Sequence, residues 1–259
     1  MPSTIKFEDY ANKYENVAME RHDGILLLRF HTGGEEFVWT LDAHDALPYL
    51  FSEIASDKEN KVIILTGTGD AFCNKIDFST FNSRNASEWE NVLYEGSRLL
   101  NNLLAINVPV ISAVNGPARY HPEIPVMSDI VIASNTAVFR DHHYSRGVVP
   151  GDGAHVIWTH ILGPNRGRYF LFTGQDMDAA TALQYGAVNE VVEPKDVLPR
   201  AWELAKVIAA KPFLVRRYTR EVLTQQFKRL LHDGITVGLA LEGLAKMDSL
   251  IPPPPPKGQ

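Results

Sequence analysis

The sequence has very little cysteine and no long apolar run. Among its 259 residues only Cys73 is a cysteine, so an intrachain disulfide and a zinc site built from several cysteines are both excluded. No apolar stretch approaches the roughly 20 residues that a membrane-spanning helix needs, and the N-terminus lacks an apolar core after a basic segment. These absences predict a globular, cytoplasmic protein with no membrane partner.

Clustered positive charge and nucleotide-binding motifs are also lacking. The net charge of -6 argues against a nucleic-acid partner, because binding to phosphates needs clustered Lys and Arg. The chain has no Walker A sequence, no GxGxxG fingerprint and no GxSxG nucleophile elbow. These motif-based nucleotide and serine-hydrolase chemistries therefore have no support.

Strands and helices alternate through the first part of the chain. A turn signal at residues 22–24 divides two β-rich runs within 17–31, which predicts a hairpin. Helical periodicity over 42–56 is followed by a buried strand in KVIILTG. A helix over 87–106, with Ser87 as its N-cap, leads to strands in PVISAVNG and DIVIAS. This alternation predicts the α/β class with a largely parallel sheet.

The last part of the chain is mainly helical. A further strand in AVNEVV precedes long helices from about 198 to 251, so residues 1–197 are expected to form the core and 198–251 a helical region. The proline-rich tail, 252–259, cannot be helical and is expected to be an extended polyproline segment.

Histidine and aspartate gather in loops that follow predicted strands. Asp141, His142 and His143 are consecutive, Asp152 lies shortly downstream, and His121 occupies an earlier loop. A histidine beside a carboxylate can act as a general base, because the carboxylate fixes the tautomer and stabilises the imidazolium that forms. The same groups could bind a metal, although no HExxH or other ligand spacing is present. A purely structural role in turns is the third interpretation.

Several segments, in the right order, resemble the crotonase, or enoyl-CoA hydratase/isomerase, superfamily. They are LTGTGDAFCNKIDF at 65–78, PVISAVNGPA at 109–118, SDIVIAS at 128–134 and VFRDHHYSRGVVPGDGAHVIW at 138–158. The resemblance implies a spiral of repeated β-β-α turns with C-terminal trimerisation helices. It also implies a homotrimer or a dimer of trimers.

The chain departs from this superfamily at two catalytic positions. The CoA-dependent members carry a glycine-rich stretch that supplies a backbone N–H to the thioester oxyanion hole. Here residues 119–122 read Arg-Tyr-His-Pro, and Pro122 has no N–H to donate. His143 occupies the position of the second catalytic glutamate of the hydratases, while Asp152 stands within PGDG.

These departures are similar to the β-diketone hydrolases, the branch of the superfamily that includes 6-oxocamphor hydrolase. The shared motifs run nearly end to end: VWT, IDF, HPEIPVMSDIV, VPGDGAHV, NRGRYF and LALEGLA. The resemblance implies retro-Claisen hydrolysis of a cyclic or bicyclic β-diketone to a keto acid. The substrate's second carbonyl accepts the electrons, so neither CoA nor a metal is needed.

The same resemblance implies a role for each candidate residue. His143 and Asp152 would activate water, and His121, supported by Glu242, would bind the substrate carbonyl. His142 is ambiguous, because a shift of one residue in the comparison would exchange it with His143. The implied substrate-binding residues are a hydrogen-bond donor and three aromatic side chains that wall an apolar pocket: Trp39, Phe78, Phe81 and Tyr120.

Two alternatives stay open from the sequence. One is a CoA-dependent enoyl-CoA hydratase or isomerase that still binds a thioester. The other is a catalytically inactive crotonase-fold protein that serves as an oligomeric interaction module. Polar residues at every expected catalytic position argue against the second alternative.

Overall fold

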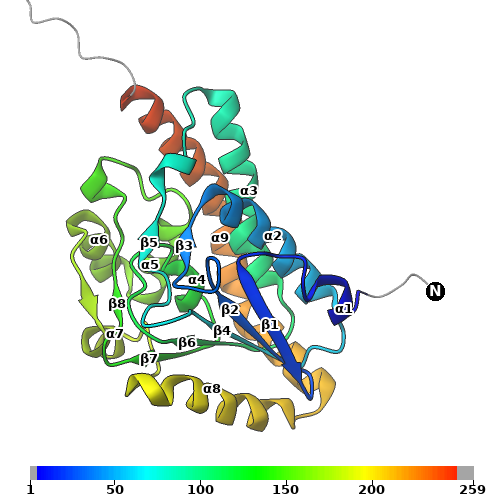
Figure 1. Ribbon diagram of the computed structural model, residues 1–259. Coiled ribbons are helices and arrows are strands. Elements are labelled where there is room, and N and C mark those ends of the chain that lie inside the picture. The colour runs from blue at the N-terminus through cyan, green and yellow to red at the C-terminus, as the bar shows by residue number, and fades with distance from the viewer. Residues whose placement is uncertain (1–4, 250–259) are drawn as a thin grey trace, which may run out of the picture.

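The computed structural model describes residues 5–249, and a six-stranded sheet forms its centre (Figure 1). The strand order is β1-β2-β4-β6-β7-β10. β1 and β2 pair antiparallel, as the predicted hairpin requires, and the other neighbours pair parallel. The α/β prediction with a largely parallel sheet is therefore confirmed. The six strands are β1 Val17–His22, β2 Ile25–Phe30, β4 Val62–Thr66, β6 Val110–Val114, β7 Ile130–Ser134 and β10 Glu190–Val192.

Two small two-stranded sheets lie outside the central one. β3, Val38–Trp39, pairs parallel with β5, Lys75–Ile76, and β8, Val138–Phe139, pairs antiparallel with β9, Met177–Asp178. Short 3-10 turns cover Phe78–Thr80 and Tyr144–Arg146. The α-helices are α1 Phe7–Tyr10, α2 Leu41–Ser56, α3 Ala86–Ala105, α4 Glu123–Val126, α5 Ala154–Ile161, α6 Pro164–Thr173, α7 Ala179–Tyr185, α8 Pro194–Ala209 and α9 Phe213–Ser249.

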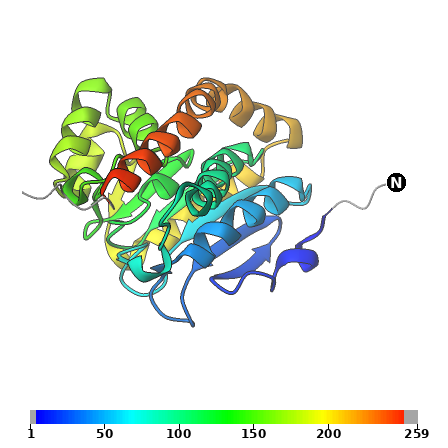
Figure 2. The ribbon, with the colours of Figure 1, turned by 90° about the horizontal axis from the view of Figure 1, so that it is seen from above.

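Helices cover both faces of the central sheet. Successive strand residues point to opposite faces, so Leu26 and Leu28 join the core that also contains buried residues of α2, α3 and α9, while Ile25 and Leu27 join the cluster that includes residues of α8. Burial on both faces explains why the strands read as continuous apolar runs. α8 lies on the side of the sheet away from α2, α3 and α9 (Figure 1), and α9 lies beside α3 (Figure 2).

Helix boundaries differ in places from the sequence prediction. Ser87 is not the N-cap of α3, because the helix begins at Ala86 and the extended residue Asn85 accepts a hydrogen bond from the N–H of Glu88. α8 begins at Pro194, four residues before the predicted helical region. Residue 251 and the proline-rich tail, 252–259, lie outside the described residues.

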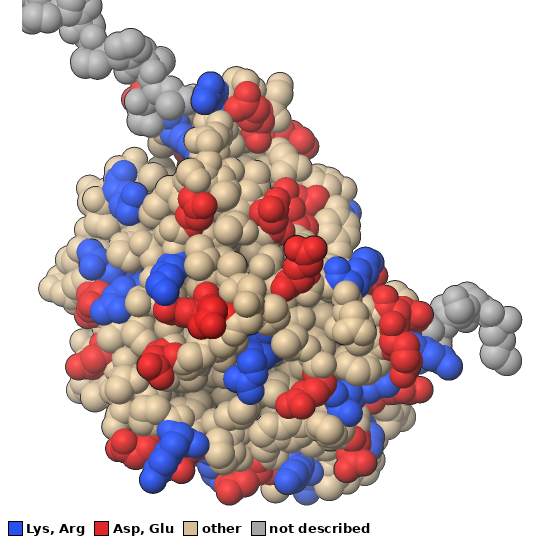
Figure 3. All heavy atoms as spheres, in the orientation of Figure 1, with Lys and Arg blue, Asp and Glu red and all other residues tan. Residues whose placement is uncertain are grey.

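Among residues 5–249, no helix is both long enough and apolar enough to cross a membrane. Acidic and basic side chains are interspersed over the face seen in Figure 3.

Candidate active site

A pocket of about 520 Å³ opens where several loops meet the C-terminal helix. The loop after β6 contributes His121, the loop after β8 contributes His143, the turn before α5 contributes Asp152, and α9 contributes Glu242. The structure therefore brings together around one pocket all four residues to which the sequence assigns catalytic roles.

Asp141 is the carboxylate that holds His143. One oxygen, Oδ1, accepts the backbone N–H of His143 at 3.1 Å, and Oδ2 lies 3.0 Å from the ring atom Nδ1. Asp141 is only 2% exposed, so it is held close to the ring away from water. This pair favours the tautomer with hydrogen on Nδ1 and leaves Nε2 facing the pocket.

Asp152 lies between the two imidazoles. Its Oδ1 accepts the backbone N–H of Ala154 at the start of α5, which leaves Oδ2 turned toward the histidines. Oδ2 is 3.4 Å from Nε2 of His143 and 3.6 Å from Nδ1 of His121. Asp152 therefore faces the free nitrogen of His143, while Asp141 fixes the other one. The pair that the resemblance implies, His143 with Asp152, is therefore in contact through Nε2, whereas the partner of Nδ1 is Asp141.

His121 is held in an uncommon backbone conformation. Its φ of 45° lies in the left-handed region, where residues other than glycine are uncommon and histidine is among the enriched types. Pro122 follows it and begins the short helix α4. Backbone strain of this kind gathers at functional sites when the surrounding structure enforces it, and here the strained residue places its imidazole in the pocket.

Glu242 reaches the pocket because α9 packs very closely against the loop that precedes α5. A β-carbon on Gly151 would collide with the backbone of Gly238, and a β-carbon on Gly238 would collide with Gly151 in return. Two glycines thus let the backbones meet one turn before Glu242. Its Oε1 lies 3.9 Å from Nε2 of His143. Among the described residues Glu242 pairs with His143 within 4 Å, and no such pair joins it to His121, so the support of His121 by Glu242 stays a prediction.

Glu123 is a buried acid that the sequence prediction missed. It is 1% exposed, and neither carboxylate oxygen has a hydrogen-bond partner among residues 5–249. Its Oε2 lies 3.8 Å from Nδ1 of His121. The motif HPEIPV contains Glu123 beside the predicted His121, so the residue type was visible, but its complete burial depends on tertiary packing.

The pKa values of the two imidazoles are shifted in opposite directions. Burial lowers the pKa of His121 to about 4, and the nearby Asp152 only partly opposes this effect. Burial also disfavours the charged form of His143, but the negative charges of Asp152 and Asp141 outweigh it and raise the pKa of His143 well above its ordinary value. His121 is therefore a neutral imidazole near pH 7, whereas His143 favours the cation.

The pKa values of the carboxyl groups in the pocket are also shifted in opposite directions. Burial raises the pKa of Glu242 to about 8 and that of Glu123 well above its ordinary value. Burial acts in the same direction on Asp152, but His143 and His121 outweigh it and lower the pKa of Asp152. The pocket thus contains neutral acids beside an ionised Asp152, an arrangement that can both accept and donate protons.

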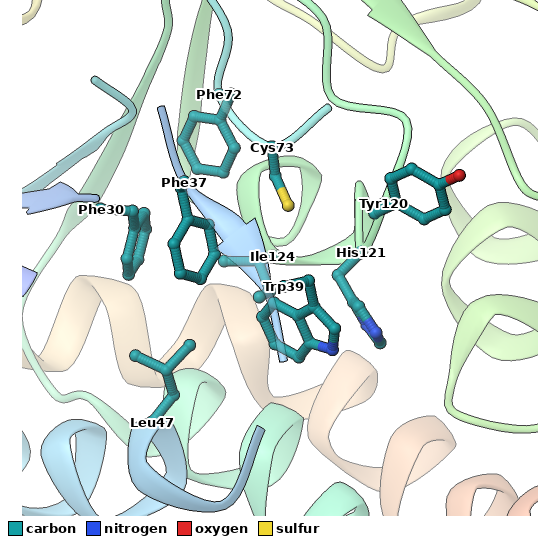
Figure 4. A pocket seen from close by; sticks show the side chains of 9 residues that line it. All are labelled: Phe30, Phe37, Trp39, Leu47, Phe72, Cys73, Tyr120, His121 and Ile124. Atoms are coloured by element: carbon teal, nitrogen blue, oxygen red, sulfur yellow. The ribbon is translucent and has the colours of Figure 1, made fainter. Parts of the chain in front are cut away.

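Trp39 lies beside the pocket in a second, smaller cavity that it shares with His121 (Figure 4). The indole and imidazole rings are 3.9 Å apart between centroids. The indole N–H is completely buried and has no hydrogen-bond partner within residues 5–249. A substrate oxygen next to His121 is the natural acceptor for such a donor.

The predicted aromatic wall lines the larger pocket. Phe78, Phe81 and Tyr120 all border it, and so does His142, whose ring stacks on Tyr120 at 4.8 Å. His44 of α2 also borders the pocket, 4% exposed, although the sequence prediction gave it no functional role.

The backbone N–H groups after β6 are largely occupied. Arg119 and Tyr120 both donate their N–H groups to the carbonyl oxygen of Cys73, at 2.9 and 3.1 Å. Pro122 has none. Of the four residues that replace the glycine-rich stretch, three therefore cannot offer an N–H to a substrate oxyanion.

A divalent cation would find suitable ligands in the same place. His121, Glu123 and Asp152 each offer one ligand atom, and these atoms lie within 4.8 Å of one another. One imidazole and two carboxylates suit several divalent metals. The donor set is therefore compatible with a metal, and a chelator can test whether one is needed.

Comparisons with known proteins agree on the family. The Enoyl-CoA hydratase/isomerase family matches residues 23–242. A short-chain-enoyl-CoA hydratase of Clostridium acetobutylicum is 30% identical over 233 residues, which cover 89% of this chain and 87% of that protein.

Two solved structures show the same fold. A β-diketone hydrolase of the cyanobacterium Anabaena sp. PCC 7120, bound to (S)-3-oxocyclohexyl acetic acid, is 46% identical with a TM-score of 0.91, covering 93% of this chain and 98% of that one. An enoyl-CoA hydratase/isomerase of Mycobacterium paratuberculosis is 23% identical with a TM-score of 0.84, covering 91% and 97%.

Proposed function

The chain belongs to the enoyl-CoA hydratase/isomerase family, and within this family we propose that it is a CoA-independent β-diketone hydrolase. The reaction would split a carbon–carbon bond of a cyclic or bicyclic β-diketone and release a keto acid. The similar Anabaena protein is named for this activity, and its bound ligand is itself a keto acid.

One observation carries the proposal: the imidazoles of His121 and His143 meet at the carboxylate of Asp152 inside the pocket. A retro-Claisen hydrolysis needs a base for water and a donor for the carbonyl that receives the electrons. Two imidazoles of opposite pKa shift, on either side of one carboxylate, fit these two tasks.

Water activation falls to His143. Its Nδ1 is occupied by Asp141, so Nε2 of the neutral imidazole is the atom that would take a proton from water. Because the raised pKa of His143 favours the cation near pH 7, this base form increases as pH rises. The oxygen of that water bonds to one carbonyl carbon and gives a tetrahedral intermediate. The intermediate collapses when the bond to the carbon between the two carbonyls breaks. That bonding pair forms an enolate, and a proton then returns to carbon to give the keto acid.

His121 and Trp39 would donate hydrogen bonds to the oxygen of the second carbonyl. His121 is neutral near pH 7, so it can donate one N–H without carrying a charge into the buried pocket. The indole N–H of Trp39 lacks a partner in the described chain and lies against the same imidazole. Two N–H donors at the developing enolate oxygen would stabilise it where water is excluded.

Thioester chemistry is disfavoured by the loop after β6. The N–H groups of Arg119 and Tyr120 are bonded to Cys73, and Pro122 has none. The curated relatives of similar length are nevertheless enoyl-CoA hydratases, so this activity is the competitor that an assay must address.

Self-association into trimers is part of the proposal. α9 exposes a row of apolar side chains near its start, and such rows commonly mark an interface between subunits. They are Leu214, Val215, Tyr218, Val222 and Leu223.

The test is turnover of a symmetrical bicyclic β-diketone by the pure protein, with EDTA and without CoA. We expect the diketone absorbance to fall as a keto acid forms, and crotonyl-CoA to remain unchanged. Hydration of crotonyl-CoA, with no cleavage of diketones across several ring sizes, would contradict the proposal. Cleavage that EDTA abolishes would instead assign a metal to His121, Glu123 and Asp152.

A further inference from the structure

The outer wall of the pocket is basic. Arg119, Arg140 and Arg146 all border it. The carboxylate of Asp176 accepts a hydrogen bond from Arg119 at 2.9 Å and lies 3.6 Å from Arg140. Asp176 is 44% exposed, so water weakens its hold on both guanidinium groups. Two of the three cations, Arg119 and Arg140, thus share one partly solvated carboxylate.

Two polar atoms of this wall are buried without a partner. The Nε of Arg140 and the Nε2 of His142 have no hydrogen-bond partner within residues 5–249. Both residues border the pocket, and burial, with the charges of Arg140 and Arg146 adding to it, lowers the pKa of His142. A buried N–H donor of a cation that lacks an acceptor is costly unless a ligand supplies one.

Stacked rings hold these groups in place. Tyr120 stacks on His142, and Phe78 meets Tyr120 edge to face at 6.0 Å. The guanidinium of Arg146 lies 3.8 Å from the centre of the Phe78 ring. The outer wall therefore combines aromatic faces with cationic ends.

The inner wall has the opposite charge. Two carboxylates, Asp141 and Asp152, lie there beside one cation, His143, so the balance of charge is negative. Glu123 and Glu242 lie close by, and burial keeps both of them neutral near pH 7. A ligand with one anionic group would be repelled from the inner wall and attracted to the outer one. Such a ligand can enter in only one favourable direction, with its uncharged end toward the histidines.

We propose that the outer wall binds an anionic oxygen group carried by the substrate, so that the natural substrate is a β-diketone with a carboxylate on a side arm. The inference rests on the proposed function for the diketone part. Arg140 provides the principal contact, Arg146 adds charge at the mouth, and the ring wall covers the apolar arm.

The test compares two neutral-ring substrates that differ in one charge. One is 2-methyl-2-(2-carboxyethyl)cyclohexane-1,3-dione, and the other is its methyl ester. We expect kcat/KM for the acid to exceed that for the ester by about tenfold at low salt, as one charge-assisted hydrogen bond provides. High salt should reduce the ratio, because it screens the attraction.

Variants locate the effect. Arg140→Gln should bring the acid-to-ester ratio close to one, and Arg140→Lys, which keeps the charge, should retain most of it. Arg98→Gln is the matched control, because Arg98 also stacks on an aromatic ring, Tyr94, but does not border the pocket. A wild-type ratio near one, or a ratio that survives Arg140→Gln combined with Arg146→Gln, would overturn the proposal.

Two further measurements separate the explanations. Calorimetric binding of the acid and the ester needs no turnover, so it tests the outer wall even if neither compound is cleaved and the proposed function fails. Acid binding about tenfold tighter than ester binding, lost in Arg140→Gln, would support the site. Competitive inhibition by CoA that Arg140→Gln relieves would assign the wall to CoA phosphates and overturn the substrate-carboxylate proposal.

Discussion

Two buried polar clusters in this protein differ in how completely their atoms are paired. The first lies beside α1 and β1, where the Tyr10 hydroxyl donates to Asp57 at 2.9 Å and Arg21 donates to the same carboxylate oxygen at 2.7 Å. Asn60 donates to the Tyr10 oxygen, and the other oxygen of Asp57 accepts the N–H of Glu59. Both oxygens of the buried Asp57 thus have partners.

The second cluster is the candidate active site, and its contacts are long. Apart from the bonds of Asp141 to His143 and of Ala154 to Asp152, its ionisable groups approach one another at 3.4 to 3.9 Å. Among residues 5–249, both oxygens of Glu123, one oxygen of Glu242 and the indole N–H of Trp39 have no partner.

The difference separates a structural cluster from a functional one. A buried polar group without a partner costs about 1 to 3 kcal/mol, so packing alone would not maintain several of them in one place. Local violations of the pairing rule are expected at functional sites, where a ligand completes the pairing. The four tests below act on this contrast.

Removal of the proposed base should have the largest effect. His143→Ala should lower kcat for the diketone by roughly 10²- to 10⁴-fold, the usual contribution of a well-placed general base, while the protein stays folded. The assay follows keto acid formation under saturating substrate. His22→Ala, in the exposed hairpin turn, is the control. A variant that kept a third of the wild-type rate would remove His143 from the mechanism.

The paired cluster should respond in stability and not in rate. Asp57→Ala leaves Arg21 and Tyr10 without their acceptor, and breaking a buried ion pair costs about 3 to 5 kcal/mol of unfolding free energy. Urea unfolding measures the loss, and kcat of the folded fraction should be unchanged. Glu59→Ala removes only an exposed partner of Arg21 and should cost less than about 1 kcal/mol. Equal losses in the two variants would contradict the assignment.

Replacing a buried acid that has no hydrogen-bond partner in the described chain should have the reverse effect, a gain in stability with a loss of activity. Glu123→Leu replaces a carboxyl group that has no hydrogen-bond partner in the described chain with an apolar side chain of similar size, and should raise the unfolding free energy by about 1 kcal/mol or more. The same variant should lose activity. Glu123→Gln keeps the polar atoms and should show no gain in stability. A destabilised Glu123→Leu protein would mean that the carboxyl group is a structural one.

The pH dependence of the rate should depend on the Asp141 contact. The base form of His143 is the neutral imidazole, so kcat/KM should increase as pH rises through its raised pKa. Asp141→Asn removes one of the charges that raise this pKa, and the increase should then occur at lower pH. The profile is measured with the neutral ester substrate. If kcat/KM rose at the same pH in the wild type and in Asp141→Asn, another group would control the pH dependence.

The sequence was sufficient for the architecture because the signals there are local. The turn at 22–24 and the apolar strand runs correctly predicted the hairpin and the parallel sheet. The cap of α3 was misplaced although its signal was present: Asn85 and Glu88 have the spacing of a capping box. Ser87, the predicted cap, instead lies in the first turn of the helix.

The contacts between carboxylates and imidazole nitrogens inside the site could not be predicted from the sequence. The sequence resemblance indicated His143, Asp152, His121 and Glu242, and these residues do border one pocket. That Glu242 faces Nε2 of His143 depends on how closely α9 approaches the loop before α5, and two glycines set that distance through tertiary packing. Residue types alone cannot specify such contacts.

The most direct test of the account is a single turnover of a bicyclic β-diketone in water enriched in ¹⁸O, with EDTA and without CoA. If His143 activates water for direct attack, one ¹⁸O atom should enter the carboxyl group of the keto acid in the first turnover, and His143→Ala should form almost no product. An unlabelled carboxyl group, which would indicate attack by an enzyme carboxylate, or a requirement for CoA, would contradict the mechanism.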